Sequence, residues 1–273
     1  MDYGYCWIQK QRRNMLNIRD LDVQFQLDDN IIHAVKGISY DVQPGQSVGI
    51  VGESGSGKSV SALAIMGLLP ASASIKGTIS FHNNSLLQLP DDEYRRIRGK
   101  KIGYIFQNPL AALNPVFTIA NQMIETIQLH HSISKDAARS YAIELLDKVK
   151  IVDPQKRIDD YPHQFSIGMC QRIMIAMTLS MKPELLIADE PTASLDVTTQ
   201  KEILELIDEL KTEYNMAMIF ISHDLAVVAE RCDHVAVMYL GNIVEQGNPR
   251  QIFTNPQNEY TKLLIDAIPK ISF

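Results

Sequence analysis

Alternating apolar and polar positions in the first part of the chain predict several short β-strands. Apolar side chains recur from Met15 to Phe25, and a short apolar run at 47–51 follows the turn at 43–45. Residues 60–69 then have the spacing of a helix. Strand character is found at residues 15–25, 34–42, 47–51, 75–89 and 102–106.

The middle of the chain, from Leu110 to Met181, changes to helical spacing. Its clearest segment is 137–149, where apolar side chains recur three and four positions apart. After Pro183, strands and helices alternate, as in a parallel sheet with helices packed on it. The elements predicted there are strands at 185–188, 217–222 and 235–239 and helices at 198–214 and 225–231. The pattern therefore predicts a helical insertion in a β/α core.

The composition excludes several classes of protein. A formal charge of −6 over 273 residues leaves no basic surface for nucleic acid, so no nucleic-acid partner is expected. The longest apolar run, 62–69, is shorter than the roughly 18–20 residues of a membrane-spanning helix. The start of the chain does not have the pattern of a secretory signal, and the three cysteines lack a disulfide or metal-site spacing. These features predict a cytosolic protein.

A phosphate-binding loop is predicted between the strand at 47–51 and the helix at 60–69. Residues 52–59 fit the pattern G-x-x-x-x-G-K-[ST] in the strand-to-helix context that it requires. Backbone amides around the glycines favour phosphate, Lys58 can reach its β and γ oxygens, and Ser59 can hold Mg²⁺. The residues expected to contact ATP are Gly52, Glu53, Ser54, Gly55, Ser56, Gly57, Lys58, Ser59 and Val60.

Two carboxylates follow the apolar strand at 185–188. Asp189 and Glu190 fall at its C-terminal end, where open α/β sheets bind their ligands. Asp189 is expected to reach Mg²⁺, directly or through water, and Glu190 to act as general base or to position the attacking water. With the phosphate loop, this acidic pair predicts hydrolysis of ATP.

Three motifs within one stretch carry a resemblance to a known family. They are Phe-Ser-Ile-Gly-Met-Cys-Gln-Arg at 165–172, Leu-Leu-Ile-Ala-Asp-Glu at 185–190 and Ser-Leu-Asp at 194–196. With the phosphate loop they resemble the nucleotide-binding subunit of ABC transporters over nearly the whole chain. Segments 106–109, 113–115 and 252–269 are similar to the ATPase subunits of dipeptide, oligopeptide and nickel importers, most of all to the D-type subunit of dipeptide importers.

The resemblance implies roles that the pattern leaves open. Gln107 resembles the family's glutamine that touches Mg²⁺ or the attacking water and senses the membrane partner. His223 resembles the switch histidine, which contacts the γ-phosphate. Phe25 is the expected adenine-stacking residue, with His33 or Ile32 as alternatives. The implied catalytic residues are Glu190, His223, Gln107 and Lys58, and the implied Mg²⁺ ligands are Ser59, Gln107 and Asp189.

One motif departs from the family. The family's signature reads Leu-Ser-Gly-Gly-Gln, and in this chain Ile167 replaces its first glycine. In the family this signature closes over the γ-phosphate held by a second ATPase subunit. A β-branched residue disfavours positive φ and fills space near phosphate, or alternatively Ile167 points away and the backbone amides still work. Because a homodimer would carry the change twice, a heterodimer is favoured. The residues expected to serve the partner's site are Ser166, Ile167, Gly168, Met169 and Asp196.

The fold implied by the resemblance is α/β. It is a P-loop ABC ATPase core with a mostly parallel sheet, an N-terminal antiparallel β subdomain and an inserted helical subdomain. Residues 1–14 are expected to be a flexible extension of an ATP-binding domain at 15–273. Within that domain the core with its β subdomain is expected at 15–107 and 182–247, the helical subdomain at 108–181 and a subfamily tail at 248–273.

The implied function is ATP hydrolysis with Mg²⁺ to power import of di- or oligopeptides or a related solute. The implied partners are a second ABC ATPase subunit, two membrane-spanning permease subunits and, indirectly, an external substrate-binding protein. The implied location is the cytoplasmic face of the inner membrane of a prokaryote. No iron–sulfur cluster is expected, because the sequence lacks the cysteine-rich segment found in many relatives. The alternatives are a nucleotide-binding regulatory subunit with weak hydrolysis and a soluble, non-transport ABC ATPase.

Overall fold

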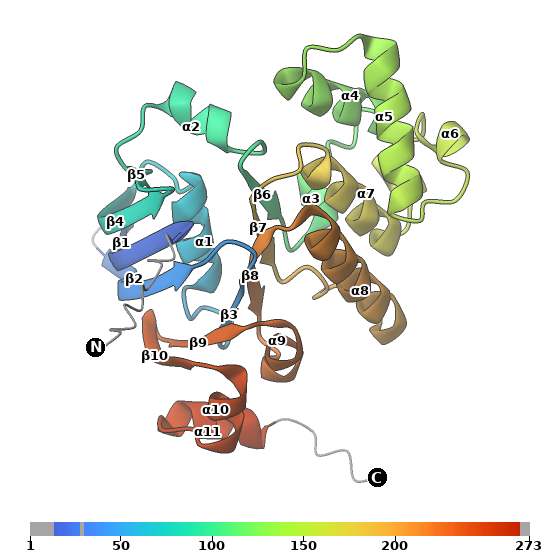
Figure 1. Ribbon diagram of the computed structural model, residues 1–273. Helices are drawn as coiled ribbons and strands as arrows, with labels where there is room; N and C mark the ends of the chain where they lie inside the picture. The colour runs from blue at the N-terminus through green and yellow to red at the C-terminus, as the bar shows by residue number, and fades with distance from the viewer. Residues whose placement is uncertain (1–13, 28–29, 268–273) are drawn as a thin grey trace, which may run out of the picture.

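Two β-sheets form the framework of the computed structural model, which describes residues 14–27 and 30–267 (Figure 1). The strands are β1 (Leu16–Leu27), β2 (Asn30–Val42), β3 (Ser47–Val51), β4 (Ala73–Phe81), β5 (Asn84–Ser85), β6 (Ile102–Ile105), β7 (Leu185–Asp189), β8 (Ala217–Ser222), β9 (His234–Tyr239) and β10 (Asn242–Gly247). The first sheet is antiparallel, with order β2-β1-β4-β5. The second has order β10-β9-β3-β8-β7-β6, and its neighbours run parallel except β10.

The helices lie on both sides of the second sheet and in a separate lobe that holds α4, α5 and α6 (Figure 1). They are α1 (Lys58–Met66), α2 (Asp91–Ile97), α3 (Pro109–Ala112), α4 (Ile119–His130), α5 (Lys135–Lys148), α6 (Pro154–Arg157), α7 (Ile167–Leu179), α8 (Val197–Tyr214), α9 (Leu225–Arg231), α10 (Pro249–Thr254) and α11 (Glu259–Asp266). None of the helices in the described part of the chain has the length and apolar character needed to span a membrane.

Polar side chains mark where the longer helices begin. Thr118, Ser134, Ser166 and Asp196 are the N-cap residues of α4, α5, α7 and α8, and each accepts a backbone N–H from the first turn of its helix. A Ser, Thr or Asp cap satisfies an amide that the helix itself leaves unpaired, which stabilises the start by about 1 kcal/mol. Two of these caps, Ser166 and Asp196, are also predicted functional residues.

The central strands divide their side chains between two cores. Leu186 and Ala188 of β7 belong to a core that includes α7 and α8, whereas Leu185 and Ile187 belong to a core shared with the first sheet and α1. Successive residues of a strand point to opposite faces, so covering both faces requires the continuous apolar runs seen in the sequence. Every residue of β3 and β7 is buried, which fixes the ends of these two strands firmly.

The predicted fold class is confirmed, with an antiparallel first sheet, a mostly parallel second sheet and a helical lobe between β6 and β7. The helix predicted at 60–69 begins two residues earlier, at Lys58. The predicted extension at 1–14 lies outside the described residues apart from Asn14, as does the end of the predicted tail at 268–273.

Candidate functional site

The loop between β3 and α1 requires glycine at two positions because strands pass close to it. Gly57 has a φ of +100°, and a Cβ there would lie 2.3 Å from the carbonyl oxygen of Ala34 in β2. A Cβ on Gly52 would lie 2.1 Å from the carbonyl oxygen of Met238 in β9. The two glycines therefore let the chain turn between these strands and enter α1 at its N-terminus, where the helix dipole favours an anion.

Lys58 is folded back over this loop and is only 4% exposed. Its Nζ donates to the carbonyl oxygens of Gly52, at 2.8 Å, and Glu53, at 2.9 Å, and lies 3.6 Å from Oε1 of Glu190. Burial lowers the pKa of Lys58, while the carboxylates of Glu190 and Asp189 oppose that shift. The loop thus holds a cation in place by its own carbonyl groups.

Asp189, at the end of β7, accepts hydrogen bonds from α1 and from β6. Its Oδ1 accepts the hydroxyl of Ser59 at 2.9 Å, and its Oδ2 accepts the hydroxyl of Tyr104 at 2.8 Å. Burial raises the pKa of Asp189, and the bonds from Tyr104 and Ser59 partly offset that effect. The adjacent hydroxyl and carboxylate oxygens are ligands that Mg²⁺ prefers, so these residues fit the predicted ion.

Glu190 is the point at which the predicted catalytic residues meet. Nε2 of Gln107 donates to its Oε2 at 2.9 Å, Nδ1 of His223 lies 3.5 Å from the same oxygen, and Lys58 approaches the other oxygen. Glu190 has a φ of +43°, an unusual conformation for a residue with a side chain, and its amide donates to the carbonyl oxygen of Ile221 at 3.0 Å. Backbone strain of this kind is often found at functional sites.

A cavity of about 210 Å³ connects these groups. It reaches from the phosphate loop to the side chains of Gln107 and Glu190. Its lining residues are Ala34, Ser54, Gly55, Gly57, Lys58, Ser59, Val60, Gln107 and Glu190. Most of the residues predicted from separate parts of the sequence to bind phosphate or carry out chemistry therefore border one space.

The predicted adenine contact is not among the residues that line this cavity. Phe25 in β1 is half-buried and packs against the core that contains the first sheet. Ile32 is paired with it across the β1–β2 ladder, and His33 lies 2.5 Å from the carboxylate of Asp22. The role of Phe25 and of these two alternatives stays a prediction.

The signature segment lies at the start of α7, and the backbone strain considered for Ile167 does not arise. Oγ of Ser166 accepts the amide of Met169 at 3.3 Å. Ile167 is the first residue of the helix, is not among the residues with positive φ, and exposes 43% of its surface. Ser166 is exposed too, so the start of α7 faces solvent and does not border the cavity of its own chain.

The start of α8 packs against the signature segment. A Cβ on Gly168 would lie 2.7 Å from Cγ2 of Thr199, so glycine permits the close approach of α7 to α8. Asp196 accepts the amides of Thr198 and Thr199, both at 3.1 Å, and hydrogen bonds from Thr199 lower the pKa of Asp196. Thr199 contacts both Gly168 and Asp196. The segment from Ser166 to Met169 therefore lies beside Asp196, the fifth residue predicted to serve a partner's site.

Sequence reasoning missed two tyrosines that support the site. Tyr104 was part of a strand predicted to be buried, and the pattern gave no sign that its hydroxyl would reach Asp189. Tyr260 belongs to the tail motif, and its hydroxyl accepts the amide of Glu53 in the phosphate loop at 3.0 Å. Each contact joins residues far apart in sequence, which no local pattern can reveal.

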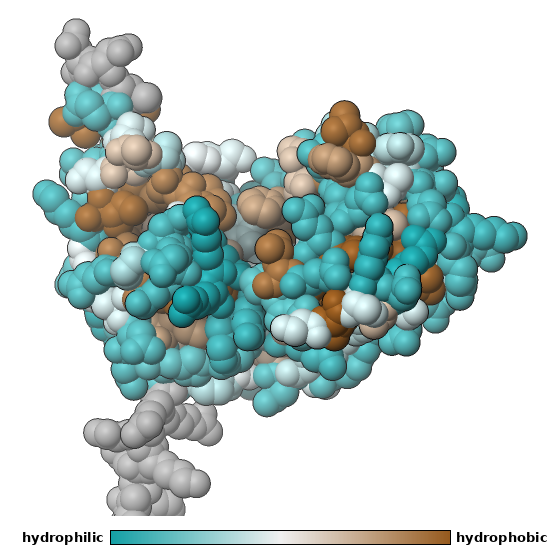
Figure 2. Space-filling model, turned by 90° about the horizontal axis from the view of Figure 1, so that it is seen from above, coloured by the Kyte–Doolittle hydropathy of each residue, from teal (hydrophilic) through white to brown (hydrophobic). Residues whose placement is uncertain are grey.

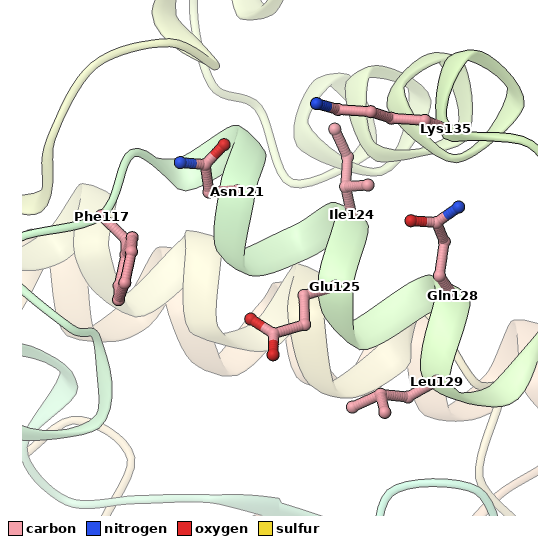
Figure 3. Close-up of a pocket in the computed structure, with 7 residues that line it drawn as sticks. All are labelled: Phe117, Asn121, Ile124, Glu125, Gln128, Leu129 and Lys135. Carbon is pink, nitrogen blue, oxygen red and sulfur yellow. The ribbon is translucent and has the colours of Figure 1, made fainter.

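A second hollow runs along α4 in the helical lobe. This α4 groove has a volume of about 500 Å³ and is lined by Phe117, Asn121, Ile124, Glu125, Gln128, Leu129 and Lys135 (Figure 3). Leu129 is 74% exposed and Phe117 is 49% exposed, and Figure 3 shows Glu125 and Leu129 projecting from the same side of α4. Hydrophobic side chains also break the mainly hydrophilic surface in several patches in the view from above (Figure 2). The groove combines apolar surface with both signs of charge.

Comparison with known proteins gives a consistent result. The profile of the ABC transporter family matches residues 35–193. The oligopeptide transport ATP-binding protein OppD of Escherichia coli K12 is 46% identical over 263 residues, which are 96% of this chain and 78% of the relative. The dipeptide transport ATP-binding protein DppD of Bacillus subtilis 168 is 48% identical over 259 residues, 94% of this chain and 77% of the relative. A solved structure of the ATP-binding cassette MJ0796 shows a dimer in a post-hydrolysis state bound to ADP and Pi. It aligns with this chain with a TM-score of 0.77 and 27% sequence identity, and the alignment covers 86% of this chain and 99% of that chain.

Proposed function

Because this chain belongs to the ABC transporter family, we propose that it is the ATP-hydrolysing subunit of a membrane importer of di- or oligopeptides. Its relatives OppD and DppD are ATP-binding proteins of oligopeptide and dipeptide transport. The observation that carries the proposal is the carboxylate of Glu190, which meets Gln107, His223 and Lys58 beside a loop suited to phosphate. This arrangement supports the proposal, because Glu190, Gln107 and Lys58 line one cavity, where they would act as a base, a group that orients it and a cation.

In this mechanism, binding of ATP and activation of water are linked through Lys58. Its ammonium group turns from Glu190 toward the β- and γ-phosphate oxygens, because they carry more negative charge than a single carboxylate. Glu190 is then free to accept a proton from a water molecule whose oxygen attacks the γ-phosphorus, while the bond to the leaving ADP oxygen breaks. Gln107 and His223, which already contact Glu190, orient that water and the γ-phosphate.

Ser59, Asp189 and Gln107 would hold Mg²⁺, which neutralises charge on the phosphate oxygens when it is bound. Ser59 and Asp189 already touch each other at 2.9 Å. The hydroxyl of Tyr104 fixes the second carboxylate oxygen of Asp189, while the first oxygen faces the hydroxyl of Ser59, which lines the cavity. Supporting hydrogen bonds of this kind orient metal ligands and tune their affinity.

A second ABC ATPase subunit would complete the site with its own signature, while Ser166 to Met169 and Asp196 of this chain would serve the site of that subunit. The dimeric state of the MJ0796 cassette supports this arrangement. Ile167 favours a heterodimer, because its exposed side chain stands where the family has a glycine. This chain would then hold a complete hydrolytic residue set for one site and an altered signature for the other.

The α4 groove is the proposed contact for a cytoplasmic helix of one of two membrane-spanning permease subunits. An apolar helix face fits a groove that offers Leu129 and Phe117, and Glu125 and Lys135 supply charges of both signs at its rim. Such contacts would hold the chain at the cytoplasmic face of the inner membrane of a prokaryote. An external binding protein would then deliver the peptide to the permease.

The test is ATP turnover and peptide uptake by the complete transporter in lipid vesicles, with Glu190→Gln in this chain. Glutamine keeps the shape and the contact with Gln107 but cannot take a proton, so we expect turnover and uptake to fall at least about 100-fold. The matched control is Glu209→Gln on the exposed face of α8, which should leave both rates unchanged. Full turnover in Glu190→Gln would instead support the alternative of a regulatory nucleotide-binding subunit.

A further inference from the structure

The C-terminal helix α11 touches the phosphate loop directly. The amide of Glu53, the second residue of the loop, donates to the hydroxyl oxygen of Tyr260 at 3.0 Å, across 207 positions of sequence. The carbonyl oxygen of Glu53 accepts Nζ of Lys58 at 2.9 Å. A single residue of the loop is therefore held on its amide side by the tail and on its carbonyl side by the phosphate-binding lysine.

Tyr260 is itself held in place by the last two strands of the second sheet. Its ring packs on Tyr239 at the end of β9, with centroids 4.1 Å apart. The carboxylate of Glu245 in β10 accepts the amides of Gln257 and Asn258 just before α11, at 2.9 and 3.0 Å. Burial would raise the pKa of Glu245, but these bonds outweigh it and the pKa is lowered, so the carboxylate is ionised at neutral pH.

The same part of the sheet supports the loop at a second point. The amide of Gly241, in the turn between β9 and β10, donates to the carbonyl oxygen of Ser56 at 3.0 Å. The loop thus rests on the backbone of the turn between β9 and β10 at Ser56 and on a side chain from the tail at Glu53. Only the second support depends on docking of α11.

We propose that Tyr260 is a positioning residue for nucleotide binding, through which the docked tail helix α11 holds the phosphate loop in its binding conformation. Tyr260 is no ligand of the nucleotide and acts through Glu53 and, beyond it, Lys58. Loss of its hydroxyl leaves the Glu53 amide without this partner and lets the loop sample conformations in which Lys58 and the loop amides no longer converge. The affinity for nucleotide then falls by the fraction of molecules that leave the binding conformation.

This inference rests on the proposed function in one respect, namely that the loop binds nucleotide. The experiment compares wild type, Tyr260→Phe and Tyr141→Phe as purified full-length chains titrated with MgADP in a calorimeter. Tyr141→Phe is the matched control, because its hydroxyl donates to the carbonyl oxygen of Ser180 at 3.1 Å within the helical lobe. Both variants lose one hydrogen bond of a tyrosine, but only one of those bonds reaches the loop.

We expect Tyr260→Phe to raise the Kd for MgADP about two- to tenfold, the range for one hydrogen bond, and Tyr141→Phe to leave it unchanged. A readout specific to positioning is hydrogen exchange of the Glu53 amide, which should speed up in Tyr260→Phe while exchange within α11 stays as in wild type. Glu245→Gln, which weakens the clamp before α11, should raise the Kd in the same direction by a smaller factor.

The outcomes separate this inference from the proposed function. Absence of MgADP binding by the wild-type chain would contradict the proposed function. Wild-type binding with an unchanged Kd and unchanged Glu53 exchange in Tyr260→Phe would overturn the role of Tyr260. If Tyr260→Phe does not fold, Glu245→Gln decides, because an unaltered Kd together with faster exchange in α11 would show that docking of the tail does not matter to the loop.

Discussion

The phosphate site and the signature surface of this chain differ in how far the chain itself completes them. At the phosphate site Lys58, Asp189 and Glu190 are each nearly buried and joined to partners from other elements. At the start of α7, Ser166 and Ile167 are exposed, and neither lines the cavity of the phosphate site. Under the proposed function, the phosphate site would bind its nucleotide within one chain, whereas the signature surface would act only beside a second subunit.

The largest expected effect that separates the two regions is on nucleotide affinity of the isolated chain. Replacing Lys58 by Met removes the cation whose hydrogen bonds to phosphate are worth about 1.5–3 kcal/mol, so the Kd for MgADP should rise roughly 10- to 100-fold. Calorimetric titration measures this change. Ser166→Ala and the exposed control Lys201→Met should bind MgADP as wild type does. Equal weakening in Ser166→Ala would mean that the signature already contributes to binding within one chain.

A smaller effect, on stability, tests how tightly the phosphate site is cross-linked. Tyr104→Phe removes the hydrogen bond to ionised Asp189, and we expect the free energy of unfolding of the nucleotide-free chain to fall by about 1.5–3 kcal/mol at pH 7. Urea unfolding measures it. Tyr141→Phe is again the matched control.

The pH dependence of that loss has a definite sign. Burial raises the folded-state pKa of Asp189, so between its ordinary and its raised value the folded state binds more protons than the unfolded state and stability falls as the pH rises. Without the Tyr104 bond the folded pKa rises further, because that bond lowers it. Protonation of Asp189 therefore stabilises the variant more than it stabilises wild type. The difference between their free energies of unfolding should shrink as the pH falls through that window. A difference independent of pH would point to lost packing instead.

The sequence predicted the features that depend on neighbouring residues and missed the contacts between residues far apart in the chain. The phosphate loop and the pair Asp189–Glu190 are local patterns, a strand followed at once by its polar residues, and their positions could be deduced. Tyr104 and Tyr260 act across 85 and 207 positions, and alternation alone assigns a tyrosine to a face without naming the polar group opposite. The structure supplies that pairing.

At the signature a local cue was available and was not used. Sequence reasoning left open whether Ile167 adopts a conformation suited to glycine and fills space near phosphate, or points away so that the backbone amides still work. Ser166 is a typical N-cap, however, and a residue directly after an N-cap has helical φ, which isoleucine adopts readily. The strand β10, by contrast, had no clear alternation because most of its residues are only partly buried, and it was not predicted.

At the signature surface, Gly168→Ala is expected to have a moderate effect on the free energy of unfolding. The new Cβ would lie 2.7 Å from Cγ2 of Thr199, so either Thr199 must change its rotamer or α7 and α8 must separate slightly, and we expect a loss of about 1–3 kcal/mol in the free energy of unfolding. The double variant Gly168→Ala with Thr199→Ser removes the clashing methyl group and should restore most of it. MgADP affinity of the isolated chain should be unchanged throughout, while ATP turnover of the complete transporter falls. Failure of the serine change to restore stability would place the strain elsewhere.

The smallest effect on stability, and the sharpest test of the comparison, is expected from Ile167→Gly. Ile167 is exposed at the first position of α7, so the change should cost less than about 1 kcal/mol, as should Val197→Gly at the exposed first position of α8. If its side chain keeps the partner's phosphate from the amides of α7, turnover of the complete transporter should rise in Ile167→Gly and not in Val197→Gly. An unchanged rate would show that the isoleucine points away and that the signature surface works as it stands. The reason for a heterodimer would then disappear, since two copies of this chain would close on each other without a defect.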